Sequence, residues 1–283
     1  MLKQSVYLVI LQIISVILGL ITSIYIATEL GPIDYSLLAI MAIVQTIIGV
    51  FSNTGIETIA IRNTLIWIAE SRLDKVAEYF QAAVLYRTIL AISISIIMIP
   101  YLYFQSFRYE TFSSLVYFFL CFLLVGITSA ICDSLKLLLK SLNKYSLVAS
   151  IDFTINIFSK AFGLIVFTFM GVWGYVGIIL TILLISMVVL TLKIRHYVKF
   201  RFTLKNLQPM LKESWPFLLT SYINYLVNYF DQLLVSLIAT PAIFGAYSMA
   251  KNLTIMLKLF IENVLDNLSQ GLTRFRTSAK EFS

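Results

Sequence analysis

Eight long apolar stretches, joined by loops, follow one another along this chain. A helix needs about 20 apolar residues to cross a hydrocarbon core of about 30 Å. We predict spans at residues 5–28, 37–61, 82–105, 112–135, 147–170, 172–194, 215–239 and 243–268. The composition agrees, because 60% hydrophobic residues, 12% charged residues and a mean hydropathy of +0.92 would leave a soluble domain with large apolar patches. The sequence therefore predicts an all-α membrane protein with about eight transmembrane helices.

Lys and Arg residues are concentrated in alternate loops. Sixteen of the 21 lie at the N-terminus, after the second, fourth and sixth spans, or beyond the eighth span, whereas the other loops contain only Arg108. Because positively charged loops stay in the cytoplasm, we expect a multi-pass protein of the bacterial inner (cytoplasmic) membrane with both termini inside.

The net charge of +7 then reflects topology, and we expect no nucleic acid partner. We predict that residues 62–81 form an amphipathic helix on the inner surface.

Few residues in the chain suggest reaction chemistry. Cys121 and Cys132 lie about 16 Å apart along one predicted helix, which is too far for a disulfide bond. The chain has one histidine, His196, and lacks a Gly-rich phosphate-binding loop after a strand. The short outer loops leave no room for a catalytic domain. We therefore expect no enzymatic activity, no metal site and no cofactor.

A short motif occurs twice, 209 residues apart. The copies are Leu30-Gly31-Pro32-Ile33-Asp34-Tyr35-Ser36 and Ala239-Thr240-Pro241-Ala242-Ile243-Phe244-Gly245. Each has a proline, which suits the first turn of a helix, so each predicts a tight turn. Further outer turns are predicted at 106–111 and 171. Because transporters often consist of such repeats with a binding site between them, we predict one six-helix lobe at 1–194, a basic cytoplasmic linker at 195–213 and the first helix pair of a second lobe at 214–283.

Polar side chains recur every three or four residues on several spans, which places them on one face of each helix. The second span contains Gln45, Gly49, Ser52 and Asn53; the fifth contains Asp152, Asn156, Ser159, Lys160 and Gly163; the seventh contains Ser221, Asn224, Asn228, Asp231 and Gln232; the eighth contains Lys251, Thr254, Lys258, Glu262 and Asp266. One interpretation is that these groups only link helices to one another. We favour the other, in which they face a water-filled lumen.

The charged residues within the spans are the strongest functional candidates. A charge near the bilayer centre costs about 2.5–3.5 kcal/mol on insertion scales, so we expect Lys160 and Lys251 to face the lumen, where they suit an anionic head group. For Asp231, the interpretation that these groups only link helices would have its carboxylate pair with one of these lysines. Arg87 lies about five residues inside its predicted span, and we expect its side chain to extend to the cytoplasmic interface. Lys136 is placed in the loop after the fourth span.

Several motifs along the chain occur in a recognisable order. They are Leu30-Gly31-Pro32-x-x-Tyr35, Asn53-x-Gly55 followed by Arg62, Trp215-Pro216, Asp231-Gln232 and Gly245-x-Tyr247-Ser248-x-Ala250. Together they resemble the polysaccharide (O-antigen and capsule) flippases of the multidrug/oligosaccharidyl-lipid/polysaccharide exporter superfamily, over residues 3–270. The chain departs from the family pattern at Thr28 and Glu29, where a basic residue is usual, and at Ser36, where glycine is usual.

The resemblance implies two six-helix lobes around a cationic cavity. It implies that undecaprenyl-pyrophosphate-linked oligosaccharide units cross the inner membrane by alternating access, for synthesis of O-antigen, lipopolysaccharide or capsule. The candidate substrate-binding residues are Lys160, Lys251, Arg62, Asn224 and Asn228, and the candidate coupling or gating residues are Asp231 and Asp152. The expected partners are the lipid-linked oligosaccharide, membrane lipids, and a polysaccharide polymerase with other assembly proteins. Such flippases have twelve or more spans, so we expect this chain to be incomplete.

Other functions fit the sequence less well. The main alternative is a gradient-coupled multidrug exporter of the multidrug and toxin extrusion type, which would favour an acidic cavity. A membrane polymerase or glycosyltransferase would need a large outer loop or a cytoplasmic domain. A membrane scaffold without transport activity is a further alternative.

Overall fold

The protein is all α-helical throughout the residues that the structure describes. This computed structural model describes residues 2–53, 55, 59, 62–64, 66, 67, 70, 72–109, 112–142, 144–195, 207–255 and 258. The long helices are α1 (Leu2–Ser52), α3 (Leu73–Ser106), α4 (Phe112–Ser141), α5 (Tyr145–Arg195) and α6 (Leu207–Ile238). A further helical segment covers residues 241–255. The predicted all-α fold class is confirmed for these residues.

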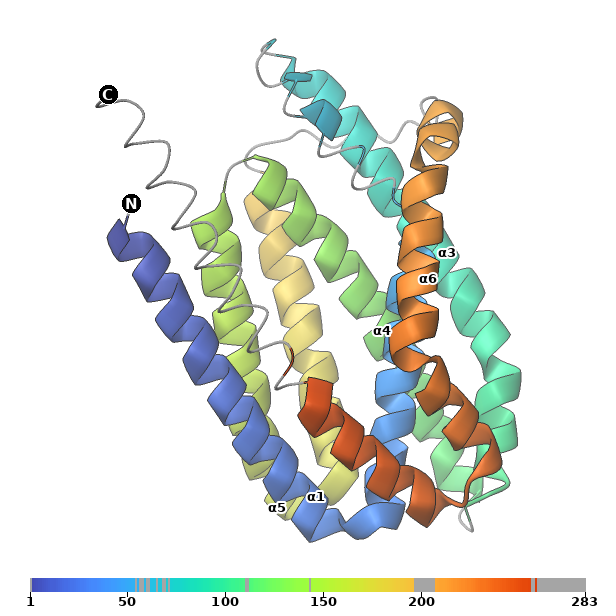
Figure 1. Ribbon diagram of the computed structural model, residues 1–283. Helices are drawn as coiled ribbons and strands as arrows, with labels where there is room; N and C mark the ends of the chain where they lie inside the picture. Colours follow the sequence, from blue (N-terminus) through green and yellow to red (C-terminus); the bar gives the residue numbers. More distant parts are fainter. Residues whose placement is uncertain are drawn as a thin grey trace, which may run out of the picture.

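Helices α1 and α5 each consist of two antiparallel arms. The backbone is non-helical at Gly31, with φ 68°, and at Gly171, with φ 61°, and the chain reverses direction at each glycine (Figure 1). A residue without a Cβ adopts positive φ at little cost, which explains glycine at both reversals. Pro32 then opens the second arm of α1, where a missing N–H costs no hydrogen bond. Both reversals lie at predicted turns.

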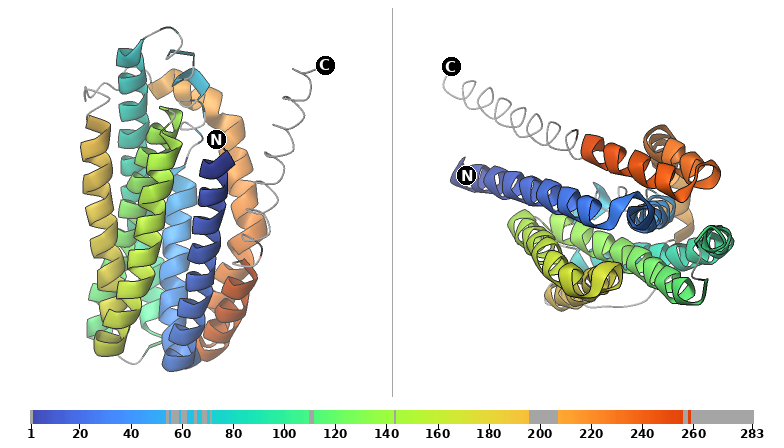
Figure 2. Two further views of the ribbon diagram at one scale, coloured as in Figure 1. Left: turned by 90° about the vertical axis from the view of Figure 1, so that its left-hand side faces the viewer. Right: turned by 90° about the horizontal axis from the view of Figure 1, so that it is seen from below.

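The arms and helices run alternately up and down as one bundle (Figures 1 and 2). The turns at Gly31, at 107–109, at Gly171 and at 239–240 lie at the same end, which we call the cation-poor end (the lower end in Figure 1). The ends of α4 and α5 and the start of α6 lie at the opposite, cation-rich end. The arrangement therefore follows the alternation of cation-poor and cation-rich loops in the sequence.

Within the described residues, four helices are long and apolar enough to cross a membrane, namely Ile17–Ser52, Phe80–Ser106, Val116–Lys140 and Leu147–Arg195. The first and last contain the reversals at Gly31 and Gly171, so the first six predicted spans fall largely within these four helices. The seventh predicted span coincides with most of α6, whereas much of the eighth lies outside the described residues. The chain is thus a helical, multi-pass membrane protein, and the number of eight spans stays a prediction.

Two predicted boundaries near the cation-rich end are wrong. Helix α1 ends at Ser52 instead of 61, because Gly55 has a positive φ of 73° and its N–H binds the side chain of Asn53 at 3.1 Å. Helix α3 begins at Leu73, so the last part of the predicted surface helix 62–81 belongs to α3. Val76 is buried there instead of lying on a membrane surface. Much of the remainder of 62–81 lies outside the described residues.

Two other boundaries also differ from prediction. Helix α4 continues to Ser141 and therefore includes Lys136, which we had placed in a loop. Helix α6 begins at Leu207, inside the predicted linker 195–213. In both cases a helix extends beyond its apolar stretch, because polar residues near the end of a bundle can still complete helical turns.

Among the described residues, buried apolar side chains form two clusters. The larger surrounds the second arm of α1 and includes Ile40, Ile48, Phe118 and Phe122. The smaller lies toward the cation-rich end and includes Val76, Phe80, Leu139, Leu190 and Ile194. Other large apolar side chains are exposed, such as Ile97, Tyr117 and Phe169. An apolar exterior of this kind is expected where helices contact lipid.

Candidate functional site

A polar cavity of about 640 Å³ lies between the second arm of α1, α3, α4 and α6. Its lining residues are Ala42, Gln45, Thr46, Gly49, Val50, Asn53, Arg87, Ser129, Asp133, Ser221, Asn224, Tyr225, Asn228 and Tyr229. The polar faces predicted for the second and seventh spans therefore meet at one cavity. Gln45 donates a hydrogen bond to Ser129 Oγ at 3.2 Å, which links the α1 and α4 walls.

Close packing holds α6 against the end of α1 at the cation-rich end. A Cβ added at Gly55 would lie 2.6 Å from Cβ of Phe217, so glycine is required for this approach. The hydroxyl of Tyr222 donates to the carbonyl oxygen of Phe51 at 3.3 Å, and the two rings lie 4.6 Å apart between centroids. These contacts explain the Asn53-x-Gly55 motif and fix the wall that carries Ser221 and Asn224.

Polar contacts close the cation-poor end of the same interface. Gln105 donates to the carbonyl oxygen of Ser236 at 2.9 Å, and the Arg108 guanidinium donates to the same oxygen at 2.5 Å and to that of Ala239. Tyr101 shares a 2.9 Å hydrogen bond with Ser236 Oγ. A guanidinium at the carbonyl end of α6 is favourable for the helix dipole. We call these contacts, from three residues of the α3 end to Ser236 and Ala239, the clasp.

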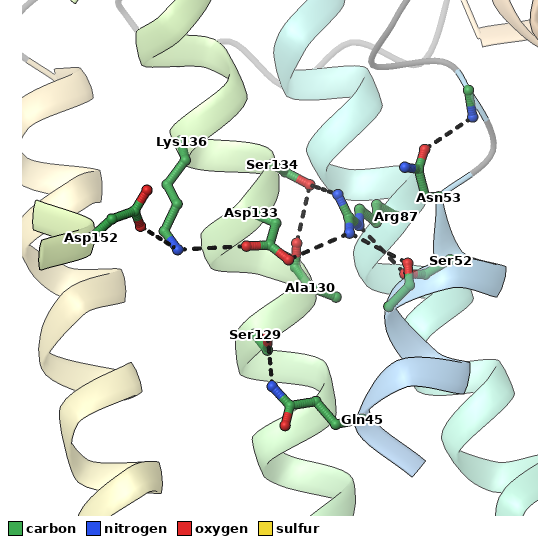
Figure 3. A network of polar contacts seen from close by, with 12 residues as sticks. Gln45, Ser52, Asn53, Arg87, Ser129, Ala130, Asp133, Ser134, Lys136 and Asp152 are labelled. Carbon is green, nitrogen blue, oxygen red and sulfur yellow. Dashed lines mark hydrogen bonds and ion pairs between the residues drawn. The ribbon is translucent and has the colours of Figure 1, made fainter. Parts of the chain in front are cut away.

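Arg87 is a cation in the lining of the cavity, and its side chain is almost fully buried. Its side chain is only 6% exposed. The guanidinium donates to Ser52 Oγ at 3.4 Å, to Ser134 Oγ at 3.3 Å and to the carbonyl oxygen of Gly49 at 3.4 Å (Figure 3). Arginine stays protonated even when buried, so these neutral groups orient a permanent positive charge. The predicted interfacial position of Arg87 is therefore wrong.

Arg87 begins a row of charges that alternate in sign across α3, α4 and α5 (Figure 3). Arg87 Nη2 lies 4.0 Å from Asp133 Oδ2, and Asp133 Oδ1 lies 3.5 Å from Lys136 Nζ. Lys136 Nζ lies 2.8 Å from Asp152 Oδ1. Asp152, a candidate coupling residue, thus forms an ion pair with Lys136. It is linked to the cavity wall through Lys136 and Asp133. We call these four residues the charge row.

A second cluster joins α6 to the helical segment 241–255. Lys251 Nζ and the Tyr247 hydroxyl both donate to the carboxylate of Asp231, which is the lysine pairing that the helix-linking interpretation would have. Lys251 lies 6.0 Å from the ring centroid of Tyr229, which lines the cavity. Lys258 donates to Asn228 Oδ1, also in the cavity lining, at 3.4 Å. These charges therefore flank the cavity.

The structure separates the remaining candidates from the cavity. Lys160 is half-buried on the first arm of α5, and it is not among the residues that line the cavity. Arg62 is exposed beyond the end of α1, also outside the lining set. Asn224 and Asn228 do line the cavity, as predicted. Glu262 and Asp266 lie outside the described residues. In the part of the chain that is described, no group of three or more His, Cys, Asp or Glu residues could hold a metal ion.

Sequence reasoning missed the main cation of the site, Arg87, and its partner Asp133. One available signal was Ser52 at the end of the polar face of the second span. The Ser52 hydroxyl accepts a hydrogen bond from the Arg87 guanidinium at 3.4 Å, so it lies where α3 brings its cation.

The fold and the cavity define a helical membrane protein with a polar, partly cationic chamber between its helices. Residues 1–265 match the family model described as "Polysaccharide biosynthesis protein". The chain belongs to this family, and the predicted resemblance is confirmed. Comparison with curated proteins gives no match, and comparison with solved structures gives none.

Proposed function

We propose that this protein moves undecaprenyl-pyrophosphate-linked oligosaccharide units across the bacterial inner membrane by alternating access, for synthesis of surface polysaccharides such as O-antigen or capsule. The observation that carries the proposal is the buried Arg87 guanidinium in the wall of the polar cavity. A pyrophosphate is bound well by guanidinium groups, which form charge-assisted hydrogen bonds to its oxygens. Amides and hydroxyls such as Asn224 and Ser129 suit the sugar hydroxyl groups. Family membership supports a role in polysaccharide synthesis.

The two ends of the cavity interface support alternating access. The clasp closes the cation-poor end, where Gln105 and Ser236 are buried. The cavity extends to Asn53 and Ser221, toward the cation-rich end. We propose that the cation-rich end is cytoplasmic, following the distribution of Lys and Arg. This conformation then accepts substrate from the inner leaflet, and release requires the clasp to open.

The other candidate residues take roles around this cavity in the proposal. Lys251 and Lys258 flank it and contribute positive potential toward the head group, and Asp231 governs the position of Lys251. Residues 1–194 act as the first lobe and 214–283 as the start of the second, with residues 195–213 as the cytoplasmic connection between them. The protein acts as a carrier without enzymatic chemistry, next to the polymerase and other proteins that use its cargo.

A multidrug exporter is the second candidate function. Its support is the exposure of Asp133 and Asp231, whose side chains are 49% and 50% exposed and would attract organic cations. Each carboxylate, however, already lies beside a cation: Arg87 or Lys136 for Asp133, and Lys251 for Asp231. The site therefore lacks the net negative charge that a cation exporter needs, and we favour the lipid-linked substrate.

Complementation tests this proposal. The gene is expressed in a flippase-deficient strain, and surface polysaccharide is measured by gel and immunoblot. We expect rescue by the wild type, a loss of tenfold or more with Arg87→Ala, and partial rescue with Arg87→Lys, which keeps the charge but loses the guanidinium geometry. Arg72→Ala is the matched control, because Arg72 is half-exposed and its guanidinium pairs with the half-exposed Glu70, away from the cavity lining. Drug resistance without polysaccharide rescue would instead favour the exporter.

A further inference from the structure

Asp133 holds an unusual position in the charge row. Its carboxylate lies between two cations, 4.0 Å from Arg87 and 3.5 Å from Lys136. Charge-assisted N–H···O bonds are typically 2.7–2.9 Å long, so Asp133 is held loosely by both. The Lys136 to Asp152 contact, at 2.8 Å, has that length. Asp133 is therefore the least firmly bound charge of the four.

Exposure also distinguishes Asp133 from its partner. The Asp133 side chain is 49% exposed and lines the cavity, whereas the Arg87 side chain is 6% exposed. A buried cation needs a counter-charge, because its desolvation is otherwise uncompensated. Among the residues that the structure describes, Asp133 is an anion paired with Arg87. An anionic ligand that enters the cavity to bind the Arg87 guanidinium therefore finds the Asp133 carboxylate already beside it.

We propose that Asp133 is an internal competitor for the anion site at Arg87. In the empty cavity its carboxylate is a counter-charge of Arg87, and the phosphate of an arriving ligand takes its place beside the guanidinium. This inference rests on the proposed function and deepens it, since it names the residue that limits affinity and promotes release of the anionic head group.

The neighbours of the pair make such an exchange feasible. Ser52, Ser134 and the carbonyl oxygen of Gly49 hold the guanidinium without contributing charge, so its orientation persists when Asp133 leaves. Asp133 is not left alone, because Lys136 lies 3.5 Å away on the same helix, one turn further along. Lys136 keeps its firm contact with Asp152 throughout. Each charge of the row thus keeps an opposite charge beside it while the ligand phosphate neutralises Arg87.

The direct test is ligand binding to the purified full chain in lipid nanodiscs, with undecaprenyl pyrophosphate as the probe and undecaprenol as the uncharged control. Asp133→Asn keeps the shape of the side chain and removes its charge. We expect it to bind the pyrophosphate roughly two- to fivefold more tightly, as expected for the loss of one partly exposed competing ion pair, with undecaprenol binding unchanged. Its transport activity should fall, because release becomes slower. A purely structural role for Asp133 would not combine tighter binding with slower transport.

Control variants separate the possible outcomes. Asp152→Asn removes a carboxylate of the same row that does not contact Arg87, and it should not tighten binding. Asp133→Glu should weaken binding, since a longer side chain brings the competing carboxylate nearer to Arg87; this variant serves if Asp133→Asn is not recovered. Unchanged or weaker pyrophosphate binding in Asp133→Asn, or tighter binding in Asp133→Glu, overturns the inference while the proposed function stands. Failure of the wild type to prefer the pyrophosphate over undecaprenol overturns both.

Discussion

Gly245 packs directly against the backbone of Pro32. A Cβ added at Gly245 would overlap the carbonyl oxygen of Pro32 and lie 2.7 Å from its carbonyl carbon. These residues belong to the two copies of the repeated turn motif, so the copies contact each other at the cation-poor end. The aromatic residues of the motif, Tyr35 and Phe244, are both buried in the same cluster, and Asn252 donates to the Tyr35 hydroxyl at 3.1 Å.

Gly245→Ala should therefore destabilise the contact between the repeats. A methyl group cannot fit against a backbone carbonyl without a shift of one helix, and overpacking of this kind costs about 1–3 kcal/mol. We expect a lower Tm of the purified protein. Gly177→Ala is the matched control, because a Cβ at Gly177 of α5 meets no atom within 4 Å. Equal Tm values for the two variants would contradict the packing described at Gly245.

Arg108→Ala should loosen the clasp. The variant loses hydrogen bonds to the carbonyl oxygens of Ser236 and Ala239 at the end of α6. A cysteine at Leu102, which is buried nearby on α3, should then react severalfold faster with an impermeant thiol reagent added outside. Arg108→Lys should show a smaller increase, and Arg72→Ala none. An unchanged rate in Arg108→Ala would show that the clasp does not limit access from this end.

Lys251 and Asp231 should behave as a coupled pair. Removing either one leaves the other charge uncompensated within a membrane helix, which is unfavourable. We expect Lys251→Met and Asp231→Asn each to reduce the amount of folded protein in the membrane severalfold, and the double variant to recover most of it. Quantitative immunoblots of membrane fractions measure this cycle. If the loss of folded protein in the double variant equalled the two single losses combined, the two charges would act independently.

Much of the fold follows from local sequence. Apolar stretches of sufficient length, glycines at Gly31 and Gly171, and the repeated proline turn located the helices and the reversals at one end. The polar faces around Gln45 and Asn224 also meet as expected, because helical periodicity determines which side chains share a face. These features depend on residues close together in the chain.

The position of Arg87 could not be predicted because it depends on where α3 begins. The apolar stretch begins at 82, which placed Arg87 near the membrane surface, but the helix begins at Leu73 and the side chain packs against Ser52 and Ser134. Likewise, periodicity places Asp152 on a face of α5 without identifying Lys136 of α4 as its neighbour. Which helices adjoin is decided by long-range packing, and no pattern within one helix encodes it.

Labelling by a water-soluble thiol reagent, with and without ligand, tests whether the cavity is aqueous and binds an anionic lipid head group. Cysteine replaces Ala42 in the cavity lining or the exposed apolar Ile97, in a protein whose native Cys121 and Cys132 are substituted. We predict that the cysteine at 42 is labelled, that undecaprenyl pyrophosphate slows this labelling severalfold, and that undecaprenol does not, while the cysteine at 97 is labelled poorly in all conditions. Absence of labelling at 42, or labelling that the pyrophosphate leaves unchanged, would contradict an aqueous cavity that binds an anionic lipid head group.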